Sequence, residues 1–582
     1  MGRYDALAIT DRRQGVKMVK YKSSEAFIEI LNAHGVERIF INPGFETLEI
    51  LSSVAGARVA GRKSPQLVLC PDESVAAAAA YGSYMVTGKP QVVMVHSELG
   101  TLQLGGNLHN LQWGRVPVLI LAAWQDRGRL LWDGRQHDQG GIVRNSVKYD
   151  RSLNGGEDLH DALRDAFRIA CTEPTGPVYL TFPMNYLYGE IDKPTRPVLP
   201  AAPDALPPVD MDTLAEMADI LVKAENPLIV SGNAGRYPQN VAALVSFAET
   251  LCAPTLTGYS WMNFPTDHPL CLGIEQLGGS RKQDADYTNA DVVIAIDYAM
   301  PYVGGAPPPN AQATILHIDV EPTTQGRPLW GRGADIFMPA NAAEAIPALE
   351  KLVKEKLTAA KKAEFEARFK RIAARNERAR QSWHEAARAQ SDCEPISADY
   401  LCYCINQIID EDTIVVNHTL THCASVTEQI VRTKPGTWFG CPSGAIGWAP
   451  GAALGAASAT DKTVVAVMTD GGFIWGCPTA TLWTSANYGF PFLAVICNNA
   501  GYGAIRNAQL QGLGGNNPSK EFWAESAVDF RPDYAMIARG AGAFGRTVTK
   551  PADVMPALSE ALDAVRAGRP AVLDVCLPGE PG

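Results

Sequence analysis

Long apolar runs are missing from this sequence. No stretch reaches the roughly 18 to 20 apolar residues that a membrane-spanning helix needs. The first residues, MGRYDALAITDRRQG, also lack the apolar centre of a secretory signal peptide. These two absences predict a cytoplasmic protein that does not interact with a membrane.

Paired metal-binding cysteines and an excess of positive charge are missing as well. The chain has 12 cysteines but no Cys-x-x-Cys pair, and Cys402 and Cys404 have no second pair to complete a metal site. We therefore expect reduced cysteines in the domain cores, as in a cytosolic protein. The net charge of −11 argues against a nucleic-acid partner, which would require a basic face.

The sequence is long enough for several domains. Its 582 residues suggest about three, at roughly 100–200 residues per domain. Strand and helix patterns alternate over 17–188, 210–352 and 391–582, which predicts an α/β protein of three doubly wound, parallel-sheet domains. A linker rich in Pro and Ala is expected over 189–209, and a highly charged connecting helix of mixed sign over 351–381.

The middle segment carries only a weak nucleotide-binding signal. Gly232-Asn233-Ala234-Gly235 follows the strand expected at 227–231, but a complete Gly-x-Gly-x-x-Gly fingerprint is absent. A plain turn is the better interpretation of these residues. A nicotinamide-dependent dehydrogenase built on this domain is therefore disfavoured.

The third segment holds the most informative pattern. An apolar strand at 464–468 leads into Asp470 and two glycines, where the backbone can approach a ligand closely. After a helical stretch, a second buried strand at 492–497 ends at two asparagines, the second of which is Asn499. In a parallel sheet both strand ends lie at the ligand-binding edge. Carboxylate, amide and backbone oxygens there suit a Mg²⁺ ion that also holds phosphate oxygens, although each motif alone is an ordinary turn signal.

This pattern resembles the thiamin diphosphate (ThDP) signature, in which Gly-Asp-Gly is followed by Asn-Asn after one helix and one strand. The first glycine of that signature is Thr469 here. The organisation of the whole chain is similar to that of the three-domain ThDP enzymes that act on 2-oxo acids, such as acetolactate synthase and benzoylformate decarboxylase. The resemblance implies a first domain that holds the aminopyrimidine ring and a third that holds the diphosphate. It also implies an active site between two subunits of a homodimer or homotetramer.

Glu73 corresponds, by this resemblance, to the family's glutamate between a strand and an Ala-rich helix. A carboxyl group there would hydrogen-bond the pyrimidine ring nitrogen and promote the imino tautomer of the cofactor. That tautomer assists removal of the thiazolium proton. The alternative for Glu73 alone is an acid in the first turn of a helix, stabilised by the helix dipole.

The resemblance assigns further cofactor contacts to the third domain. The Gly444 carbonyl would contact the cofactor's amino group, and Ile446 would be the bulky side chain that bends the cofactor, with a plain core isoleucine as the alternative. Thr419 and the Leu420 backbone would meet the diphosphate, and Gly472 would add a backbone donor. The predicted cofactor site comprises Glu73, Thr419, Leu420, Gly444, Ile446, Asp470, Gly471, Gly472, Asn499 and Gly501, of which Asp470, Asn499 and Gly501 would hold Mg²⁺.

The two predicted catalytic residues are Glu73 and His96. His96 and the Asn-Pro-Gly segment at 42–44 resemble benzoylformate decarboxylase, where the histidine assists proton transfer and binding of the substrate carboxylate. Phe45 stands where that decarboxylase has a small polar residue, and its second active-site histidine has no evident counterpart around 298–304. A lone histidine at a strand end is otherwise a solvated or hydrogen-bonded residue. The arginine-glycine FAD segment of true acetolactate synthase is not evident either.

These features predict a ThDP- and Mg²⁺-dependent enzyme that cleaves or forms the C–C bond next to a carbonyl. It would decarboxylate a 2-oxo acid and ligate the product to a second carbonyl compound, as acetolactate synthase does. A benzoylformate decarboxylase-like lyase that releases an aldehyde is the alternative, and the expected substrate is a 2-oxo acid or a hydroxyketone. A catalytically inactive ThDP-fold binding protein is a third hypothesis, which the intact Glu73, Asp470 and Asn499 argue against.

Overall fold

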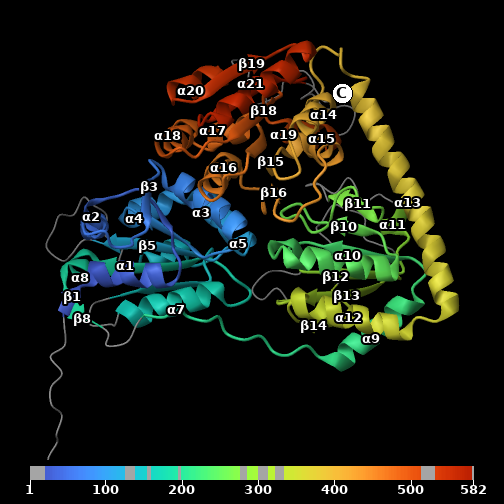
Figure 1. Ribbon diagram of the computed structural model, residues 1–582, viewed down its shortest axis with the longest axis horizontal. Helices are drawn as coiled ribbons and strands as arrows, with labels where there is room; N and C mark the ends of the chain where they lie inside the picture. The colour runs from blue at the N-terminus through green and yellow to red at the C-terminus, as the bar shows by residue number, and fades with distance from the viewer. Residues whose placement is uncertain are drawn as a thin grey trace, which may run out of the picture.

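The computed structural model describes residues 20–124, 138–153, 159–193, 198–274, 285–298, 312–321, 333–512 and 531–579. Within them the chain forms three parallel six-stranded sheets with helices packed against them (Figure 1). The predicted α/β class with three parallel-sheet domains is therefore confirmed. A short antiparallel pair, β1 (Lys20–Lys22) with β8 (Glu190–Asp192), joins the two ends of the first domain.

The first sheet has the strand order β3-β2-β4-β5-β7-β6. All five residues of its strand β4 are buried, as expected for a parallel strand covered on both faces. Its strands are β2 (Arg38–Ile41), β3 (Gln66–Leu69), β4 (Gln91–Val95), β5 (Val118–Trp124), β6 (Tyr149–Ser152) and β7 (Val178–Pro183). Its helices are α1 (Ser23–Ala33), α2 (Leu48–Val59), α3 (Glu73–Thr87), α4 (Ser97–Gln103), α5 (Gly105–Trp113), α6 (Gly140–Val143), α7 (Leu159–Cys171) and α8 (Met184–Tyr188).

The central sheet has the strand order β11-β10-β9-β12-β13-β14. Its strands are β9 (Pro227–Ser231), β10 (Thr255–Thr257), β11 (Cys271–Ile274), β12 (Val292–Ile296), β13 (Thr314–Asp319) and β14 (Ile336–Pro339). Its helices are α9 (Met211–Lys223), α10 (Gln239–Leu251), α11 (Ala285–Thr288) and α12 (Ala342–Lys356). This domain has its own hydrophobic core, in which α9, α10 and α12 cover the sheet.

The third sheet has the strand order β16-β15-β17-β18-β20-β19. Its strands are β15 (Ile414–His418), β16 (Trp438–Gly440), β17 (Val464–Thr469), β18 (Leu493–Asn498), β19 (Phe544–Val548) and β20 (Ala571–Cys576). Its helices are α14 (Ala398–Ile408), α15 (Cys423–Gln429), α16 (Trp448–Ser458), α17 (Asp470–Trp475), α18 (Pro478–Tyr488), α19 (Gly503–Gly512), α20 (Tyr534–Gly540) and α21 (Val554–Arg566). The central pair β17 and β18 carries the predicted metal-site residues at its end.

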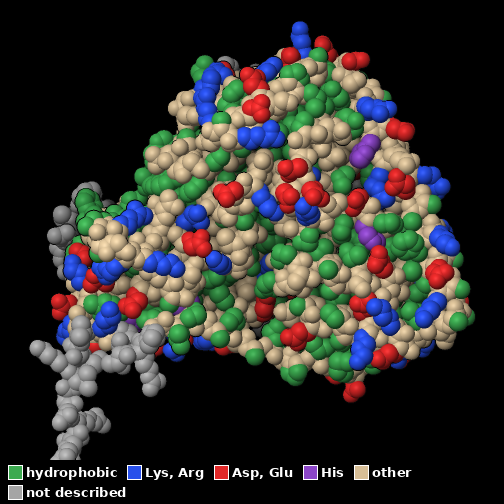
Figure 2. Space-filling view, viewed as in Figure 1, with side chains coloured by type: hydrophobic (Ala, Val, Ile, Leu, Met, Phe, Trp, Pro, Cys, Tyr) green, Lys and Arg blue, Asp and Glu red, His purple; other side chains and the backbone are tan. Residues whose placement is uncertain are grey.

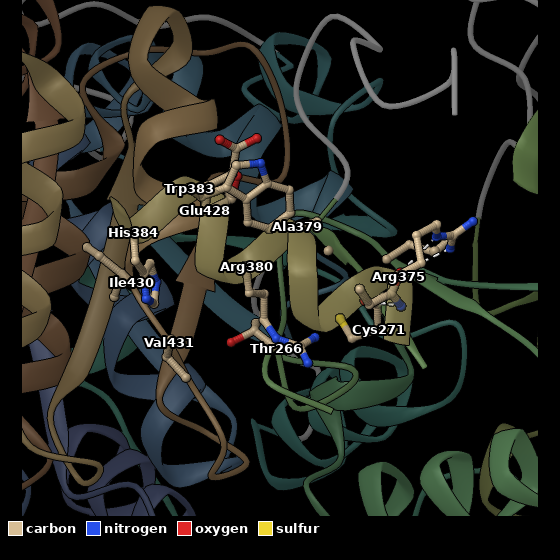
Figure 3. A pocket seen from close by; sticks show the side chains of 14 residues that line it. Thr266, Cys271, Arg375, Ala379, Arg380, Trp383, His384, Glu428, Ile430 and Val431 are labelled. Atoms are coloured by element: carbon tan, nitrogen blue, oxygen red, sulfur yellow. Dashed lines mark hydrogen bonds between the residues drawn. The ribbon is translucent and has the colours of Figure 1, made fainter. Parts of the chain in front are cut away.

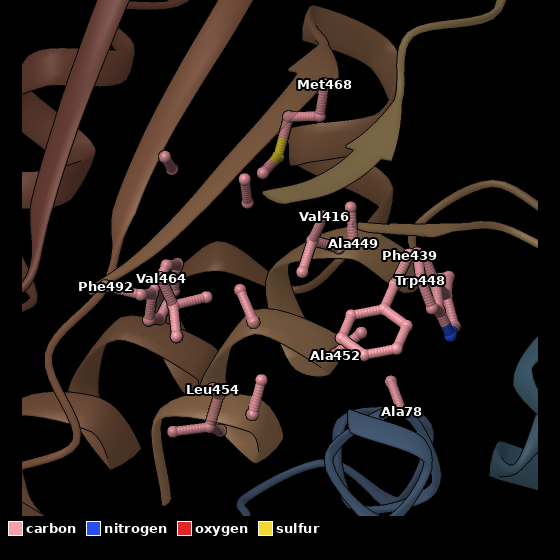
Figure 4. Packing of buried hydrophobic residues seen from close by; sticks show 14 of the residues in the cluster. Ala78, Val416, Phe439, Trp448, Ala449, Ala452, Leu454, Val464, Met468 and Phe492 are labelled. Atoms are coloured by element: carbon pink, nitrogen blue, oxygen red, sulfur yellow. The ribbon is translucent and has the colours of Figure 1, made fainter. Parts of the chain in front are cut away.

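The first and third domains share one core through the crossing of α3 and α16. A Cβ atom at Gly82 would lie 1.9 Å from the Ala452 carbonyl oxygen, and one at Gly455 would lie 1.9 Å from the Ala79 carbonyl oxygen. Only glycine permits such a close approach of two helix backbones. Figure 4 shows α3 meeting α16 and its neighbours where Ala78 faces the third domain. This crossing fixes the start of α3, and hence Glu73, relative to the third domain.

A long helix, α13 (Ala359–Arg388), runs along one side of the molecule from the central to the third domain (Figure 1). Acidic and basic side chains alternate along that side, as the mixed-sign sequence predicts (Figure 2). The helix is not wholly solvated, however, because the buried Arg368 donates to backbone carbonyls of the central domain, including those of Cys252 and Ala224. The predicted connector is therefore also a packed support for that domain.

Two expectations drawn from absences can be compared with the structure. No helix in the described parts of the chain combines the length and apolar character needed to cross a bilayer. All 12 cysteines are free thiols, eight of them are buried, and Cys393 is exposed. Among the described residues no group of three or more His, Cys, Asp or Glu side chains is arranged to hold a metal ion.

Candidate active site

The two predicted metal-site side chains follow neighbouring strands of the third sheet. Because β17 and β18 pair in parallel, Asp470 and Asn499 both lie at the carboxyl edge of that sheet. Asp470 is 2% exposed, and burial raises its pKa. Its Oδ1 accepts a hydrogen bond from the Gly471 amide at 2.8 Å, and its Oδ2 accepts one from the Gly501 amide at 3.1 Å. The structure thus brings Asp470 against the loop that carries Asn499 and Gly501.

The loop after β18 presents an amide oxygen that has no protein partner. Asn499 is 4% exposed, and its Oδ1 is buried without a hydrogen bond to any described residue. Ala500 and Gly501 have φ angles of 57° and 144°, and a Cβ atom at Gly503 would lie 2.5 Å from Asn499 Nδ2. A buried, unpaired amide oxygen is costly and is available to a cation. Asp470 retains lone pairs as well, so these hard oxygen donors fit a Mg²⁺ ion bound to a diphosphate.

The predicted diphosphate contacts lie beside this edge, with one difference in pairing. Thr419 is fully buried and donates through Oγ1 to Asn417 Oδ1 at 2.9 Å, while Leu420 has a φ angle of 35°. The Gly472 amide donates to Thr469 Oγ1 at 3.0 Å. Thr469, the residue that departs from the Gly-Asp-Gly signature, therefore accepts a hydrogen bond from the Gly472 amide, which was predicted to donate to the diphosphate. A phosphate at Gly472 would have to share this amide with the Thr469 hydroxyl or replace it.

The segment before α16 is held by the first domain of the same chain. Ser443 Oγ donates to Asn110 Oδ1 at 2.5 Å, and Asn110 Nδ2 donates to the Ala445 carbonyl at 3.2 Å. Gly444 is exposed, and a Cβ atom there would meet nothing within 4 Å. Ile446 is half-buried, which differs from the burial of a plain core isoleucine. Both residues are thus accessible to a ligand.

Glu73 is the first residue of α3, but it does not cap that helix. The cap is Asp72, whose Oδ1 accepts hydrogen bonds from the Ser74 and Val75 amides at 2.9 and 3.2 Å. Glu73 is only 4% exposed, and its Oε1 would lie 2.4 Å from a Cβ atom at Gly100 in α4. A helix-start acid that only interacts with the helix dipole has no reason to be buried. The burial of Glu73 therefore favours a role in binding.

His96 precedes α4 and is paired with a carboxylate that the sequence analysis did not identify. Its Nδ1 lies 2.7 Å from Oε1 of Glu46, which also accepts from the Ser97 amide at 3.1 Å. The side chain of Glu46 is fully buried, whereas that of His96 is 27% exposed. Only the position of Glu46, two residues after the Asn-Pro-Gly segment, could have pointed to it. Since α4 contacts Glu73 and begins after His96, it brings both predicted catalytic residues to one edge.

At the carboxyl edge of the central sheet, an ion pair joins the first and central domains. Arg115 of the first domain donates to both carboxylate oxygens of Asp319, at the end of β13, at 2.8 and 3.1 Å. In the predicted weak nucleotide loop, a Cβ atom at Gly235 would lie 2.1 Å from the Met262 carbonyl oxygen. That glycine therefore serves close packing, in agreement with the plain-turn interpretation.

A cavity of about 170 Å³ lies away from these residues, between the central domain, α13 and α15. Figure 3 shows Arg380, Trp383 and His384 of α13 among its walls. The guanidinium of Arg380 is engaged by Glu377 and by the His268 carbonyl. Among the described residues that line this cavity, none belongs to the predicted cofactor site.

Family models match each of the three domains. The N-terminal TPP binding domain of thiamine pyrophosphate enzymes matches residues 21–146, the central domain matches 214–349, and the C-terminal TPP binding domain matches 421–575. These matches support ThDP as the cofactor.

Curated relatives and solved structures agree with these models over nearly the whole chain. The chain is 26% identical to sulfoacetaldehyde acetyltransferase of Alcaligenes xylosoxydans xylosoxydans, over 99% of this chain and 96% of the relative. It is 24% identical to the acetolactate synthase large subunit of Corynebacterium glutamicum, over 97% and 88% of the two chains. The fold is similar to that of the 4-hydroxybenzoylformate decarboxylase of Rhodococcus jostii RHA1, with a TM-score of 0.75, 21% identity, and coverage of 96% and 100%. The chain therefore belongs to the family of thiamin diphosphate-dependent 2-oxo acid decarboxylases and carboligases.

Proposed function

We propose that this protein is a ThDP- and Mg²⁺-dependent enzyme that decarboxylates a 2-oxo acid and joins the product to a second carbonyl compound. The observation that carries the proposal is the buried, unpaired Oδ1 of Asn499, in the loop whose Gly501 amide donates to the carboxylate of Asp470. This pair, with the Gly501 carbonyl, provides oxygen ligands for Mg²⁺. The bound cofactor would supply the electron sink that lets CO₂ leave the acid.

The chain's own residues would bind and orient the reactants. Glu73 would hold a proton at the pyrimidine ring nitrogen, since its carboxyl is buried at the start of α3. The Gly444 carbonyl would accept from the cofactor's amino group, and Ile446 would support the bent shape of the cofactor. Thr419, Leu420 and the two glycines Gly471 and Gly472 would surround the diphosphate.

A lyase that releases an aldehyde without ligation is the second candidate. The specific observation in its favour is the part-exposed His96, which is paired with the buried carboxylate of Glu46. A histidine there can deliver the proton that converts the decarboxylated substrate to an aldehyde. A binding protein without catalysis is less compatible with the buried Glu73 and with the unpaired Asn499 oxygen, because both are retained at a cost in stability.

The proposal includes a subunit arrangement and a division of the chain. A homodimer or homotetramer would complete each site, with residues 17–188 of one chain facing residues 391–582 of another. Residues 210–352 would form the central domain between them. No nucleic acid or membrane takes part in this function.

A panel of 2-oxo acids, each with and without an aldehyde acceptor, tests the proposal. We expect ThDP- and Mg²⁺-dependent release of CO₂ from at least one acid and a hydroxyketone identified by mass when the acceptor is present. An aldehyde as the sole product would favour the lyase. Failure to bind ThDP, or no CO₂ release from any acid by the cofactor-loaded protein, would contradict the proposed function.

A further inference from the structure

Glu46 is a fully buried carboxylate in contact with a predicted catalytic residue. Its Oε1 lies 2.7 Å from His96 Nδ1 and accepts a hydrogen bond from the Ser97 amide at 3.1 Å. Its Oε2 is buried without a hydrogen bond to any described residue. We infer that Glu46 is a positioning residue, which fixes the His96 ring with a proton on Nδ1 and leaves Nε2 as the atom that exchanges a proton with the substrate.

On one side, the main chain lies against the Glu46–His96 pair at Gly44. A Cβ atom at Gly44 would lie 2.0 Å from His96 Nδ1 and 2.6 Å from each carboxylate oxygen of Glu46. Any side chain at position 44 would therefore displace both partners of the pair. The glycine of the Asn-Pro-Gly segment thus has a physical role, because it lets the imidazole and the carboxylate meet against the main chain.

The backbone on the other side is held in an unfavourable conformation that directs a donor to the same oxygen. Ser97 has a φ angle of 41°, in the left-handed region that side chains other than glycine rarely adopt. This conformation persists where surrounding contacts hold it in place, and here the Ser97 amide donates to Glu46 Oε1. The strain therefore serves to anchor the carboxylate that receives the histidine.

The pairing determines which nitrogen of His96 is protonated. A carboxylate oxygen 2.7 Å from Nδ1 can only accept, so Nδ1 must carry the proton. In the imidazolium form, Nε2 can give its proton to the substrate-derived carbon. The N–H bond breaks, a C–H bond forms, the electron pair stays on Nε2, and the neutral imidazole keeps its Nδ1 proton toward Glu46. Solvent then returns a proton to Nε2, which its partial exposure permits.

The first test needs no substrate and is therefore independent of the proposed function. In protein labelled with ¹⁵N in the rings of its ten histidines, the signal that disappears in His96→Asn belongs to His96. Solid-state NMR of the full chain should show that His96 Nδ1 is protonated in the wild type. Glu46→Ala should produce a mixture of the two tautomers. A bare Nδ1 in the wild type would overturn the inference even if Glu46→Ala did not fold, and an unchanged tautomer in a folded Glu46→Ala would also overturn it.

The second test rests on the proposed function and uses benzoylformate as the probe. The carboxylate partners of metal-bound histidines are commonly worth about 10- to 100-fold, and by analogy we expect Glu46→Ala to lower kcat by such a factor while ThDP affinity stays unchanged. In a His96→Ala background the same substitution should cost nothing further, because Glu46 acts only through His96. An equal loss in both backgrounds would contradict the positioning role. Wild-type protein that binds ThDP but decarboxylates no 2-oxo acid would contradict the proposed function instead. The NMR result would still decide the role of Glu46.

Glu49→Ala is the matched control for both tests. Glu49 lies in α2, three residues after Glu46, and forms an ion pair with Lys22 at 3.2 Å. Its removal is a change of the same kind at a nearby position that makes no contact with His96. The tautomer of His96 and the value of kcat should both remain as in the wild type.

Discussion

Asp470 Oδ2 accepts a hydrogen bond from the Gly501 amide at 3.1 Å, and this contact ties the end of β17 to the loop that follows β18. The loop is bent by two consecutive residues with positive φ angles, Ala500 and Gly501. That bend keeps the Asn499 side chain buried while the loop turns toward Asp470. The contact and the bend thereby hold together the two segments that carry the three residues proposed to bind Mg²⁺.

Asp470→Ala should abolish Mg²⁺-dependent retention of ThDP. Supporting contacts around a metal are commonly worth 10- to 100-fold in affinity, so loss of a direct carboxylate ligand should cost at least about 100-fold. Calorimetric titration of ThDP in the presence of Mg²⁺ measures the effect. Asp461→Ala, which removes an exposed carboxylate just before β17, is the control and should bind as the wild type does. Unchanged ThDP affinity in Asp470→Ala would show that this aspartate is not a metal ligand.

The active protein should be at least a homodimer. Glu73 and Asp470 belong to different domains, and the proposed site pairs the first domain of one chain with the third domain of another. Sedimentation velocity at the concentrations used for activity assays should give a species of twice or four times the chain mass of 62.5 kDa. A fully active monomer would contradict this subunit arrangement.

The purified protein should carry no flavin. The carboxyl edge of the central sheet, where a dinucleotide would bind in a domain of this class, holds the ion pair between Arg115 and Asp319. Both side chains are nearly inaccessible to solvent, at 8% and 0% exposure. Absorbance spectra before and after denaturation report bound flavin directly. A yellow protein with stoichiometric flavin would show that this ion pair opens or lies beside the true site.

Acidification should destabilise the third domain through His418. This histidine is 2% exposed at the end of β15, and burial lowers its pKa to about 4 from an ordinary value of about 6.5. Between pH 6.5 and about 4, His418 is protonated in the unfolded chain but stays neutral in the folded chain. The free energy of unfolding therefore falls as the pH drops through this range. The full effect is roughly 3 kcal/mol. His418→Phe should fall less steeply over this window in thermal unfolding of the apoprotein, and an identical slope would exclude His418 as the cause.

The three sheets could be predicted because their strands are apolar runs that end in recognisable turns. The strand predicted at 227–231 has the same bounds as the observed β9. The strand predicted at 464–468 corresponds to β17, which is one residue longer and ends at Thr469. Helix ends were harder to predict, since the charged stretch at 351–381 is divided between α12 and α13 at Thr358, which caps the second helix. A continuous apolar run identifies a strand that is covered on both faces, whereas a helix cap depends on one side chain.

The predicted site residues could be proposed because each follows a strand or begins a helix. The pairs that involve distant segments could not be proposed in the same way. Glu46 and His96 are 50 residues apart, and Arg115 and Asp319 are 204 apart, so only the folded chain brings them together. The pairing of Thr469 with the Gly472 amide is different, because Thr469 is the N-cap of α17 and a threonine at the start of a helix is a local signal that the sequence does carry.

Glu73→Gln should preserve the fold and ThDP binding while slowing loss of the proton from the thiazolium carbon of the bound cofactor. The amide retains the shape of the buried side chain beside Gly100. It cannot share a proton with the pyrimidine nitrogen as a carboxylic acid does. A well-placed acid–base group is commonly worth about 10²–10⁴-fold in rate, which corresponds to roughly 3–5 kcal/mol of activation free energy.

The competing interpretation of Glu73 predicts a change in a different quantity. An acid that only interacted with the helix dipole would contribute about 0.3–1 kcal/mol to stability, and its loss would leave the exchange rate unaltered. Hydrogen–deuterium exchange at the thiazolium carbon, quenched in acid and read by NMR, measures the proton-transfer step without any substrate. Because Asp72 already caps α3, Glu73→Gln should leave the melting temperature nearly unchanged, and thermal unfolding serves as the control. Exchange within about threefold of the wild-type rate, well below the acid–base range, would assign Glu73 a structural role only.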